Sequence, residues 1–167
     1  MLEIGTRFGE SSLEVAKTCD LHSLTCVDPY INYSEYDHDG FSTFLRRFGG
    51  DWTYKHAIRN LKKRLGEKVS FIRTFSNDSE EHLAGMLFDV VWVDGNHAED
   101  YCFNDLLLAQ KFLDCDGVIL GDDYQGEGVR RAVQKFLEIF PNASLVLLGN
   151  HGGFPKVFHI TFRKQWS

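Results

Sequence analysis

The chain has 167 residues, 43% of them hydrophobic, and a formal net charge of −6 at pH 7. This length allows one sizeable core but not two ordinary domains, so we expect a single domain over residues 1–167. The acidic balance argues against nucleic acid as the main partner, because a phosphate backbone selects basic surfaces.

Short apolar runs alternate with helix-period segments along the chain, which is typical of a parallel sheet covered by helices on both faces. In chain order the sequence predicts a strand over 2–5, a helix over 11–18, strands over 23–28 and 69–74, a short helix over 79–86 and a strand over 88–94. A helix from Ala98, a strand over 117–121, a helix over 129–140 and strands over 144–148 and 156–162 follow.

The last two strands are joined by the short link 149–155, which leaves no room for a crossover helix, so we expect an antiparallel hairpin. The predicted fold class is therefore α/β: a Rossmann-like, doubly wound, mostly parallel seven-stranded sheet with a C-terminal antiparallel hairpin. In the helix after Ala98, apolar residues recur at helical spacing through Leu113, and this stripe should leave Asp105 and Lys111 nearer solvent.

The connection over residues 29–68 is much longer than the usual link between a helix and a strand. It contains helical patterns near 41–48 and 53–65, and its first part carries aromatic and acidic residues: Tyr30, Tyr33, Tyr36, Asp37, His38 and Asp39. Because it leaves the second strand beside the expected ligand crevice, it is a candidate lid. The alternative is a packed surface insertion.

The turn from Gly5 to Gly9 opens the crevice at the carboxyl end of the first strand. It lacks the middle glycine of a dinucleotide fingerprint, which indicates a nucleoside ligand without a pyrophosphate and makes NAD a remote alternative. Glu3 could pair with the ammonium group of an amino-acid-bearing ligand, and Asp28 could accept hydrogen bonds from a ribose. By itself, such a turn also fits an ordinary strand-to-helix connection.

Asp94 ends one predicted strand, and Asp122 and Asp123 end the next. If these strands are neighbours, their ends lie about 4.8 Å apart. Carboxylates so close repel one another unless a divalent cation compensates them or one is protonated, and oxygen ligands favour Mg²⁺. Alternatively, Asp122 caps a turn and Asp94 opens a helix. His97 could be a metal ligand, a general base or a histidine that is satisfied near the helix start.

These residues form a series of motifs: Glu-Ile-Gly-Thr-x-x-Gly-x-Ser from Glu3, Val-Asp-Pro-Tyr around Asp28, Val-Asp-Gly-Asn-His around Asp94, the downstream Asp105, Gly-Val-Ile-Leu-Gly-Asp-Asp-Tyr around Asp122, and Gly-Val-Arg-Arg-Ala-Val. In order and spacing the series resembles the class I S-adenosylmethionine-dependent methyltransferases. Within that class it is most similar to the branch of macrocin-type sugar O-methyltransferases, and more distantly to catechol O-methyltransferase-like enzymes.

The resemblance implies a cofactor site and a metal site. The implied cofactor-binding residues are Glu3, Gly5 and Gly9 for the methionine part, Asp28 for the ribose, Phe75, Ser76 and Asn77 near the adenine, and in addition Thr6, Ser11 and Asp94. The implied ligands of Mg²⁺, or another divalent cation, are Asp94, Asp122 and Asp123. The implied catalytic residues are His97 and Asp94.

The sequence departs from the family pattern in three places. Asn96 stands where some relatives carry a second acidic residue, so the role of base passes to His97, and Glu99 replaces a frequent tyrosine. The predicted first strand begins at the start of the sequence, without the N-terminal cap helices of relatives. The acceptor site is therefore expected to be open, or completed by another subunit of a homo-oligomer.

The function that the resemblance implies is metal-assisted O-methylation of a small hydroxylated acceptor: a sugar, a diol or a phenol. Two alternatives remain open, namely an oxidative, cephalosporin-hydroxylase-like enzyme that would need iron, and a non-catalytic cofactor-binding module. The four cysteines lack zinc-ligand spacing. No segment resembles a signal peptide or reaches the roughly 18 apolar residues of a membrane span, so we expect a cytoplasmic location and no membrane partner.

Overall fold

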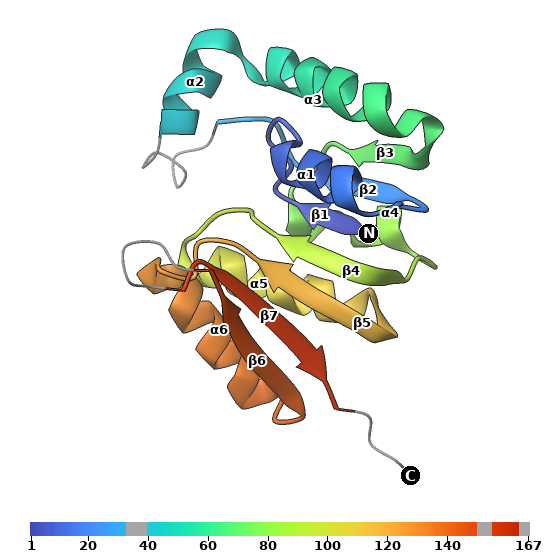
Figure 1. Cartoon of the computed structure of the whole chain (residues 1–167). Coiled ribbons are helices and arrows are strands. Elements are labelled where there is room, and N and C mark those ends of the chain that lie inside the picture. Colours follow the sequence, from blue (N-terminus) through green and yellow to red (C-terminus); the bar gives the residue numbers. More distant parts are fainter. Residues whose placement is uncertain (33–39, 150–154, 164–167) are drawn as a thin grey trace.

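The computed structural model describes residues 1–32, 40–149 and 155–163. The strands are β1 (Leu2–Ile4), β2 (Leu24–Val27), β3 (Val69–Ile72), β4 (Phe88–Val93), β5 (Leu113–Gly121), β6 (Ala143–Leu148) and β7 (Val157–Phe162). They form one sheet in the order β3-β2-β1-β4-β5-β7-β6 (Figure 1). Strands β1 to β5 are parallel, whereas β7 runs antiparallel to both β5 and β6. The predicted Rossmann-like sheet and its C-terminal hairpin are confirmed.

Helices cover the sheet from two sides. The helices are α1 (Glu10–Thr18), α2 (Gly40–Phe48), α3 (Gly50–Leu65), α4 (Glu80–Leu83), α5 (Glu99–Lys111) and α6 (Glu127–Ile139), with short 3-10 helices η2 (Gly66–Lys68) and η3 (Ser76–Asp78). Helix α3 contacts α1 and β3, and α5 contacts α6, β4 and β5. No helix in the described part of the chain is long and apolar enough to cross a membrane.

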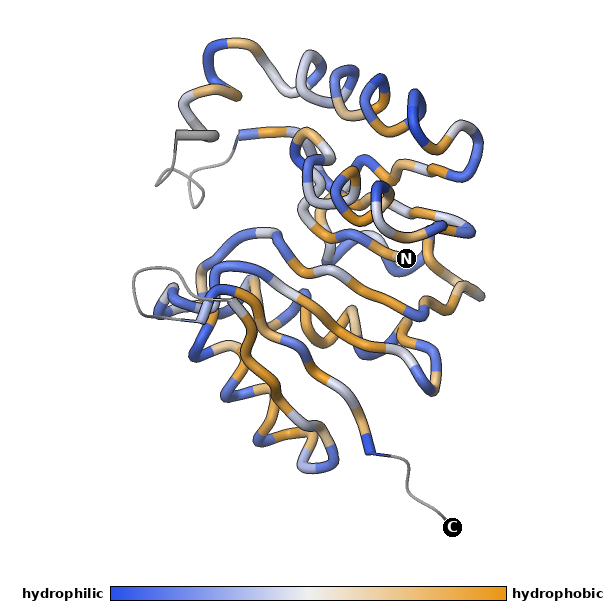
Figure 2. The backbone as a smooth tube through the Cα atoms, viewed as in Figure 1, coloured by the Kyte–Doolittle hydropathy of each residue, from blue (hydrophilic) through white to orange (hydrophobic). Residues whose placement is uncertain are grey.

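The central strands β1 and β2 are buried on both faces, as the centre of a parallel sheet requires. Leu2 and Ile4 belong to the larger core cluster, which also holds the buried residues of α5 and α6. Met1 and Cys26 belong to a second cluster with Leu61 of α3. Figure 2 accordingly draws much of the central strands in hydrophobic colours. Residues that alternate along a strand therefore pack against the helices on opposite faces of the sheet. The ends of the strands are left free of these helical layers.

Strand register brings the ends of the parallel strands level. Ile4 pairs with Val27 on one side and with Val93 on the other, and Val93 pairs with Gly121. The residues that follow these four strand ends therefore meet at one edge of the sheet. This edge carries the glycine turn and the predicted acidic residues, and it is where ligands bind in doubly wound folds.

Two predicted boundaries are wrong. Leu113, expected on a helical stripe, is the first residue of β5, where it pairs with Phe88 before the register shifts. The resulting bulge needs Gly117, because a Cβ there would lie 2.9 Å from the carbonyl oxygen of Phe88. The helix predicted over 79–86 is shorter, since α4 ends at Leu83 and Gly85 has φ +79°.

The long connection 29–68 has two distinct parts. Helix α3 buries Thr53, Ala57 and Leu61 and packs on α1 and β3, so it is the crossover helix between β2 and β3 rather than an inserted lid. The lid prediction is thereby confined to the part before α3. Of the residues on which it rested, Tyr33, Tyr36, Asp37, His38 and Asp39 lie outside the described residues.

Candidate active site

A cavity of about 700 Å³ lies at the carboxyl edge of the sheet. Its wall is built by the segments that follow β1, β2, β3, β4 and β5, together with Lys156, which immediately precedes β7. The volume is within the range of about 300–1,000 Å³ that small-molecule and cofactor sites occupy. Of the predicted cofactor-binding residues, Gly5, Thr6, Ser11, Asp28, Phe75, Ser76 and Asp94 line it, whereas Glu3, Gly9 and Asn77 do not.

The glycine turn needs its glycines for packing as well as for backbone conformation. Gly5 has φ +87°, and a Cβ there would lie 2.1 Å from the carbonyl oxygen of Asp94. Gly9 has φ +76°, and a Cβ there would collide with the side chain of Leu61. Both residues adopt the left-handed conformation that glycine tolerates best. The turn is therefore held against β4 at one end and against α3 at the other.

Glu3 lies beneath the turn rather than in the cavity. Its side chain is 1% exposed, and its Oε1 accepts a hydrogen bond from the backbone N–H of Ser12 at 3.2 Å. Burial raises the pKa of Glu3 to about 8. The direct contact with a ligand's ammonium group that the sequence suggested is absent from this wall. Glu3 instead holds the N-terminus of α1, where free N–H groups favour a carboxylate.

This raised pKa predicts a pH-dependent stability. The folded state keeps a proton on Glu3 that the unfolded state, with a pKa of 4.5, releases, so the free energy of unfolding should fall as pH rises from about 4.5 to 8. The slope from this group approaches about 1.4 kcal/mol per pH unit. In urea unfolding at several pH values, the free energy of unfolding should fall less steeply with pH in Glu3→Gln than in the native protein. In Glu14→Gln, which changes an exposed residue, it should fall as steeply as in the native protein. Equal slopes in Glu3→Gln and the native protein would contradict the assignment.

Asp28, at the end of β2, is the acid predicted to hold a ribose. It is 8% exposed and lines the cavity. Its Oδ2 accepts the backbone N–H of Arg7 at 2.8 Å, and its Oδ1 accepts that of Tyr30 at 2.7 Å. Burial raises its pKa, and these hydrogen bonds partly offset the rise. A carboxylate has about four lone-pair sites, so each oxygen can still accept a ligand hydroxyl.

The segment after β3 forms another part of the wall. Phe75 and Ser76 line the cavity, as predicted, and so does Asp105 of α5. The apolar stripe predicted that Asp105 would lie nearer solvent, but Asp105 is only 3% exposed. The prediction was wrong because the carboxyl group of Asp105 packs against Ser76 and Gly95, which follow β3 and β4 and are distant in sequence.

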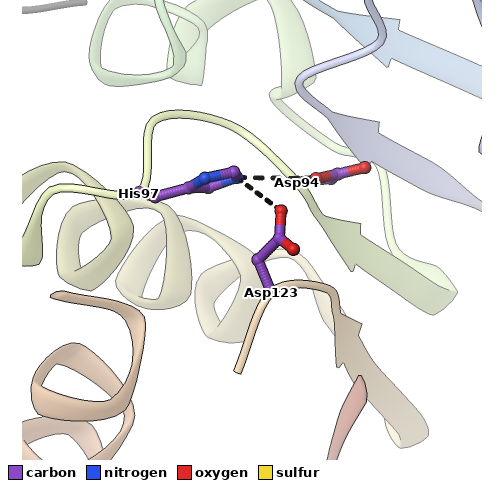
Figure 3. A group of neighbouring side chains, drawn as sticks. All are labelled: Asp94, His97 and Asp123. Atoms are coloured by element: carbon purple, nitrogen blue, oxygen red, sulfur yellow. Dashed lines mark ion pairs between the residues drawn. The ribbon is translucent and has the colours of Figure 1, made fainter. Parts of the chain in front are cut away.

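Asp94, His97 and Asp123 all line the cavity, and their side chains point toward one another (Figure 3). The Nε2 atom of His97 lies 3.8 Å from Oδ1 of Asp94 and 3.4 Å from Oδ2 of Asp123. One ligand atom from each residue lies within 4.8 Å of the others, which fits a divalent cation with carboxylate and imidazole donors. Burial, followed by the nearby charge of Asp122, raises the pKa of Asp94, whereas His97 lowers it.

Asp122 lies beside this group but is otherwise engaged. Its Oδ1 accepts the backbone N–H of Asp123 at 2.8 Å, and its Oδ2 lies 2.7 Å from Nζ of Lys156. The structure thus brings Asp94 and Asp123 together with His97, whereas Asp122, the third predicted metal ligand, pairs with Lys156. The hydrogen bond to Asp123 joins neighbouring residues, so the alternative role of Asp122 as a turn cap stays a prediction.

Lys156 is a site residue that sequence reasoning missed. It immediately precedes β7, which runs antiparallel to β5, so its side chain reaches the edge where β5 ends. Asp122 raises the pKa of Lys156, the ammonium of which supplies positive charge among three carboxylates. A signal was available, because the predicted hairpin already required the last strand to begin at this edge.

The fold and the cavity define a Rossmann-like α/β protein with a ligand-sized cavity at the carboxyl edge of its sheet, and comparisons with known proteins give the family. Residues 2–124 match the family model described as a methyltransferase domain, so the chain belongs to this methyltransferase family. No curated protein matches the sequence.

Solved structures of methyltransferases share the fold. The O-methyltransferase from Bacillus cereus, in complex with SAH, has a TM-score of 0.67 and 16% identity, over 97% of this chain and 73% of that one. The SAH-bound methyltransferase from Podospora anserina has a TM-score of 0.68 and 18% identity, over 98% and 71%. The O-methyltransferase TomG from Streptomyces achromogenes, in complex with SAM, has 0.67 and 16%, over 98% and 72%. At these identities the likeness concerns the fold.

Proposed function

We propose that the protein is an S-adenosylmethionine-dependent, metal-assisted O-methyltransferase that acts on a small hydroxylated acceptor. One observation carries the proposal: a single cavity is lined both by the glycine turn and Asp28 and by Asp94, His97 and Asp123. A methyl donor and an acceptor hydroxyl could therefore be held side by side. Such positioning is the main contribution that an enzyme makes to an in-line methyl transfer.

The cavity wall fits the cofactor. The close approach of Gly5 to β4 leaves the backbone of the turn open to a ligand, and Asp28 offers acceptors to two ribose hydroxyls. Thr6 also lines this wall, and its side chain hydrogen-bonds to the buried Glu3 beneath the turn, which fixes its position. When bound, S-adenosylmethionine supplies the methyl group.

The donor set also fits a divalent cation. The carboxylates of Asp94 and Asp123 suit Mg²⁺ or Mn²⁺. When bound, the cation lowers the pKa of an acceptor hydroxyl. Two vicinal hydroxyls can chelate one cation, so we propose a sugar, another diol or a catechol-type phenol as acceptor, in keeping with the macrocin-type branch.

We assign the role of general base to His97. Its side chain lines the cavity and is about half exposed, and its Nε2 faces the two carboxylates. An imidazole that is not bound to the cation can take the proton of an acceptor hydroxyl. Asp94 and Asp123 orient the ring.

Calorimetry with S-adenosylhomocysteine and a radiolabelled methyl-transfer assay test the proposal. We expect binding, transfer to at least one member of a panel of sugars, diols and catechols, loss of transfer with EDTA and recovery with Mg²⁺ or Mn²⁺. No binding would reject the cofactor, and transfer that survives EDTA would reject the metal. Binding without transfer to any acceptor would favour the non-catalytic module. The comparisons give no support to the oxidative alternative.

A further inference from the structure

The series of motifs in the sequence ends with Gly-Val-Arg-Arg-Ala-Val, residues 128–133, and the proposed chemistry does not use it. These residues lie in the first turns of α6. Val129, Ala132 and Val133 belong to the larger core cluster, so they anchor the helix in the core. A glycine in a helix costs up to about 1 kcal/mol relative to alanine, so Gly128 needs a different explanation.

Gly128 lies directly against the segment that carries the proposed base. A Cβ on Gly128 would be 2.3 Å from the carbonyl oxygen of His97 and 3.1 Å from the backbone nitrogen of Glu99. Both of these are backbone atoms, and heavy atoms that are not bonded to each other pack at about 3.5–4.0 Å. Only a glycine at this position therefore lets α6 approach the segment so closely.

The same end of α6 also holds the turn that carries Asp123. The backbone N–H of Gly126 donates to the carbonyl oxygen of Asp123 at 2.8 Å. The side-chain amide of Gln125 donates to Oδ1 of Asp123 at 2.7 Å, and Arg130 of the motif donates to the carbonyl oxygen of Gln125. Asp123 has φ +56°, a left-handed conformation that is uncommon for a residue other than glycine and persists only where the surroundings support it.

We propose that the first turn of α6 sets the distance between His97 and Asp123, and that Gly128 is a positioning residue for His97. The helix contacts the His97 segment at Gly128, and it holds Asp123 through Gln125 and Arg130. The other oxygen of Asp123, Oδ2, then lies 3.4 Å from Nε2 of His97. The inference rests on the role of base that the proposed function gives to His97.

Gly128→Ala should displace His97 rather than α6. The helix is anchored in the core, whereas His97 and Ala98 are exposed residues of the link between β4 and α5. Relief of the contact requires a shift of about 1 Å, and a misplacement of that size can cost about 100-fold in rate. We expect kcat to fall by about 10–100-fold, while the KM for the acceptor and the affinity for S-adenosylhomocysteine stay within about twofold of the native values.

NMR of the His97 imidazole tests the geometry without cofactor, cation or acceptor. The nitrogen signals of His97 are assigned by their loss in His97→Ala and measured at about pH 8.5, where an imidazole is ordinarily neutral. Asp123→Asn should shift these signals in the native protein. In Gly128→Ala the shift caused by Asp123→Asn should be at least about twofold smaller, because a hydrogen bond weakens steeply as donor and acceptor separate. If Gly128 had only a structural role, this coupling would be unchanged.

Gln134→Ala is the matched control, because Gln134 is an exposed residue of the same helix. It should keep the native coupling and the native kcat. Thermal unfolding should show Gly128→Ala folded, since alanine favours a helix. Gln125→Ala is a second variant on the other side of the contact: it removes the amide that holds Oδ1 of Asp123, and it should also reduce the coupling.

Equal coupling in the native protein and in Gly128→Ala overturns the inference, as does a native protein in which Asp123→Asn leaves the His97 signals in place. Either result leaves the methyltransferase proposal intact. A native protein that transfers no methyl group to any acceptor rejects the proposed function instead, and the NMR result still decides whether α6 sets the distance between His97 and Asp123.

Discussion

Replacing Gly5 with alanine is expected to abolish S-adenosylhomocysteine binding, with a loss of at least about 100-fold measured by calorimetry. The new Cβ would lie 2.1 Å from the carbonyl oxygen of Asp94 and 2.7 Å from Cα of Gly95, and both of these are backbone atoms that cannot rotate away. The turn would have to move off β4, and the positions of Thr6 and Asp94 would change with it. Stability should fall as well.

Gly85→Ala separates the two causes of this effect. Gly85 also has a positive φ, +79°, but a Cβ there meets nothing within 4 Å. The variant should lose only the free energy that a side chain costs at a positive φ, about 1–2 kcal/mol of unfolding free energy. It should bind S-adenosylhomocysteine normally. If Gly5→Ala bound the ligand as well as Gly85→Ala does, the close approach of the turn to β4 would have no functional role.

Asp123→Asn is expected to eliminate metal-dependent transfer and to weaken Mn²⁺ binding by more than about tenfold. Asp123 contributes a carboxylate oxygen to the group formed with Asp94 and His97, and an amide lacks the negative charge that a divalent cation requires there. Mn²⁺ affinity can be measured by electron paramagnetic resonance without any acceptor. Affinity for S-adenosylhomocysteine should remain close to that of the native protein.

Asp122→Asn provides the comparison within the site. Because Oδ2 of Asp122 lies 2.7 Å from Nζ of Lys156, its loss should weaken Mn²⁺ binding less than the loss of Asp123 does. The surface variant Asp20→Asn, which removes only an exposed pair with Lys68, should leave the metal affinity unchanged. If Asp122→Asn weakened Mn²⁺ binding more than Asp123→Asn does, the cation would displace Lys156 from Asp122. Asp122 rather than Asp123 would then be the metal ligand.

The order of the strands and helices was predictable because it depends on local patterns. Apolar runs such as Val90–Val93 are readable as buried strands, and the break after Val27 at Asp28 and Pro29 is readable as a strand end. The acidic residues at the strand ends were predictable for the same reason, since a parallel sheet brings its carboxyl ends to one edge. Some predicted element boundaries were wrong. Leu113 fits the helical spacing of α5, but it pairs with Phe88 and therefore belongs to β5.

The sequence alone determined the Rossmann-like sheet, its C-terminal hairpin and the edge at which Gly5, Asp28 and Asp94 meet, because strand periodicity and chain order fix these features. Only the tertiary structure decided what each acid does there: Glu3 lies under α1, Asp105 lies in the wall, and Asp122 pairs with Lys156. The physical reason is that burial and charge pairing depend on residues distant in the chain. Lys156 lies 34 positions from Asp122, and no local pattern carries that contact.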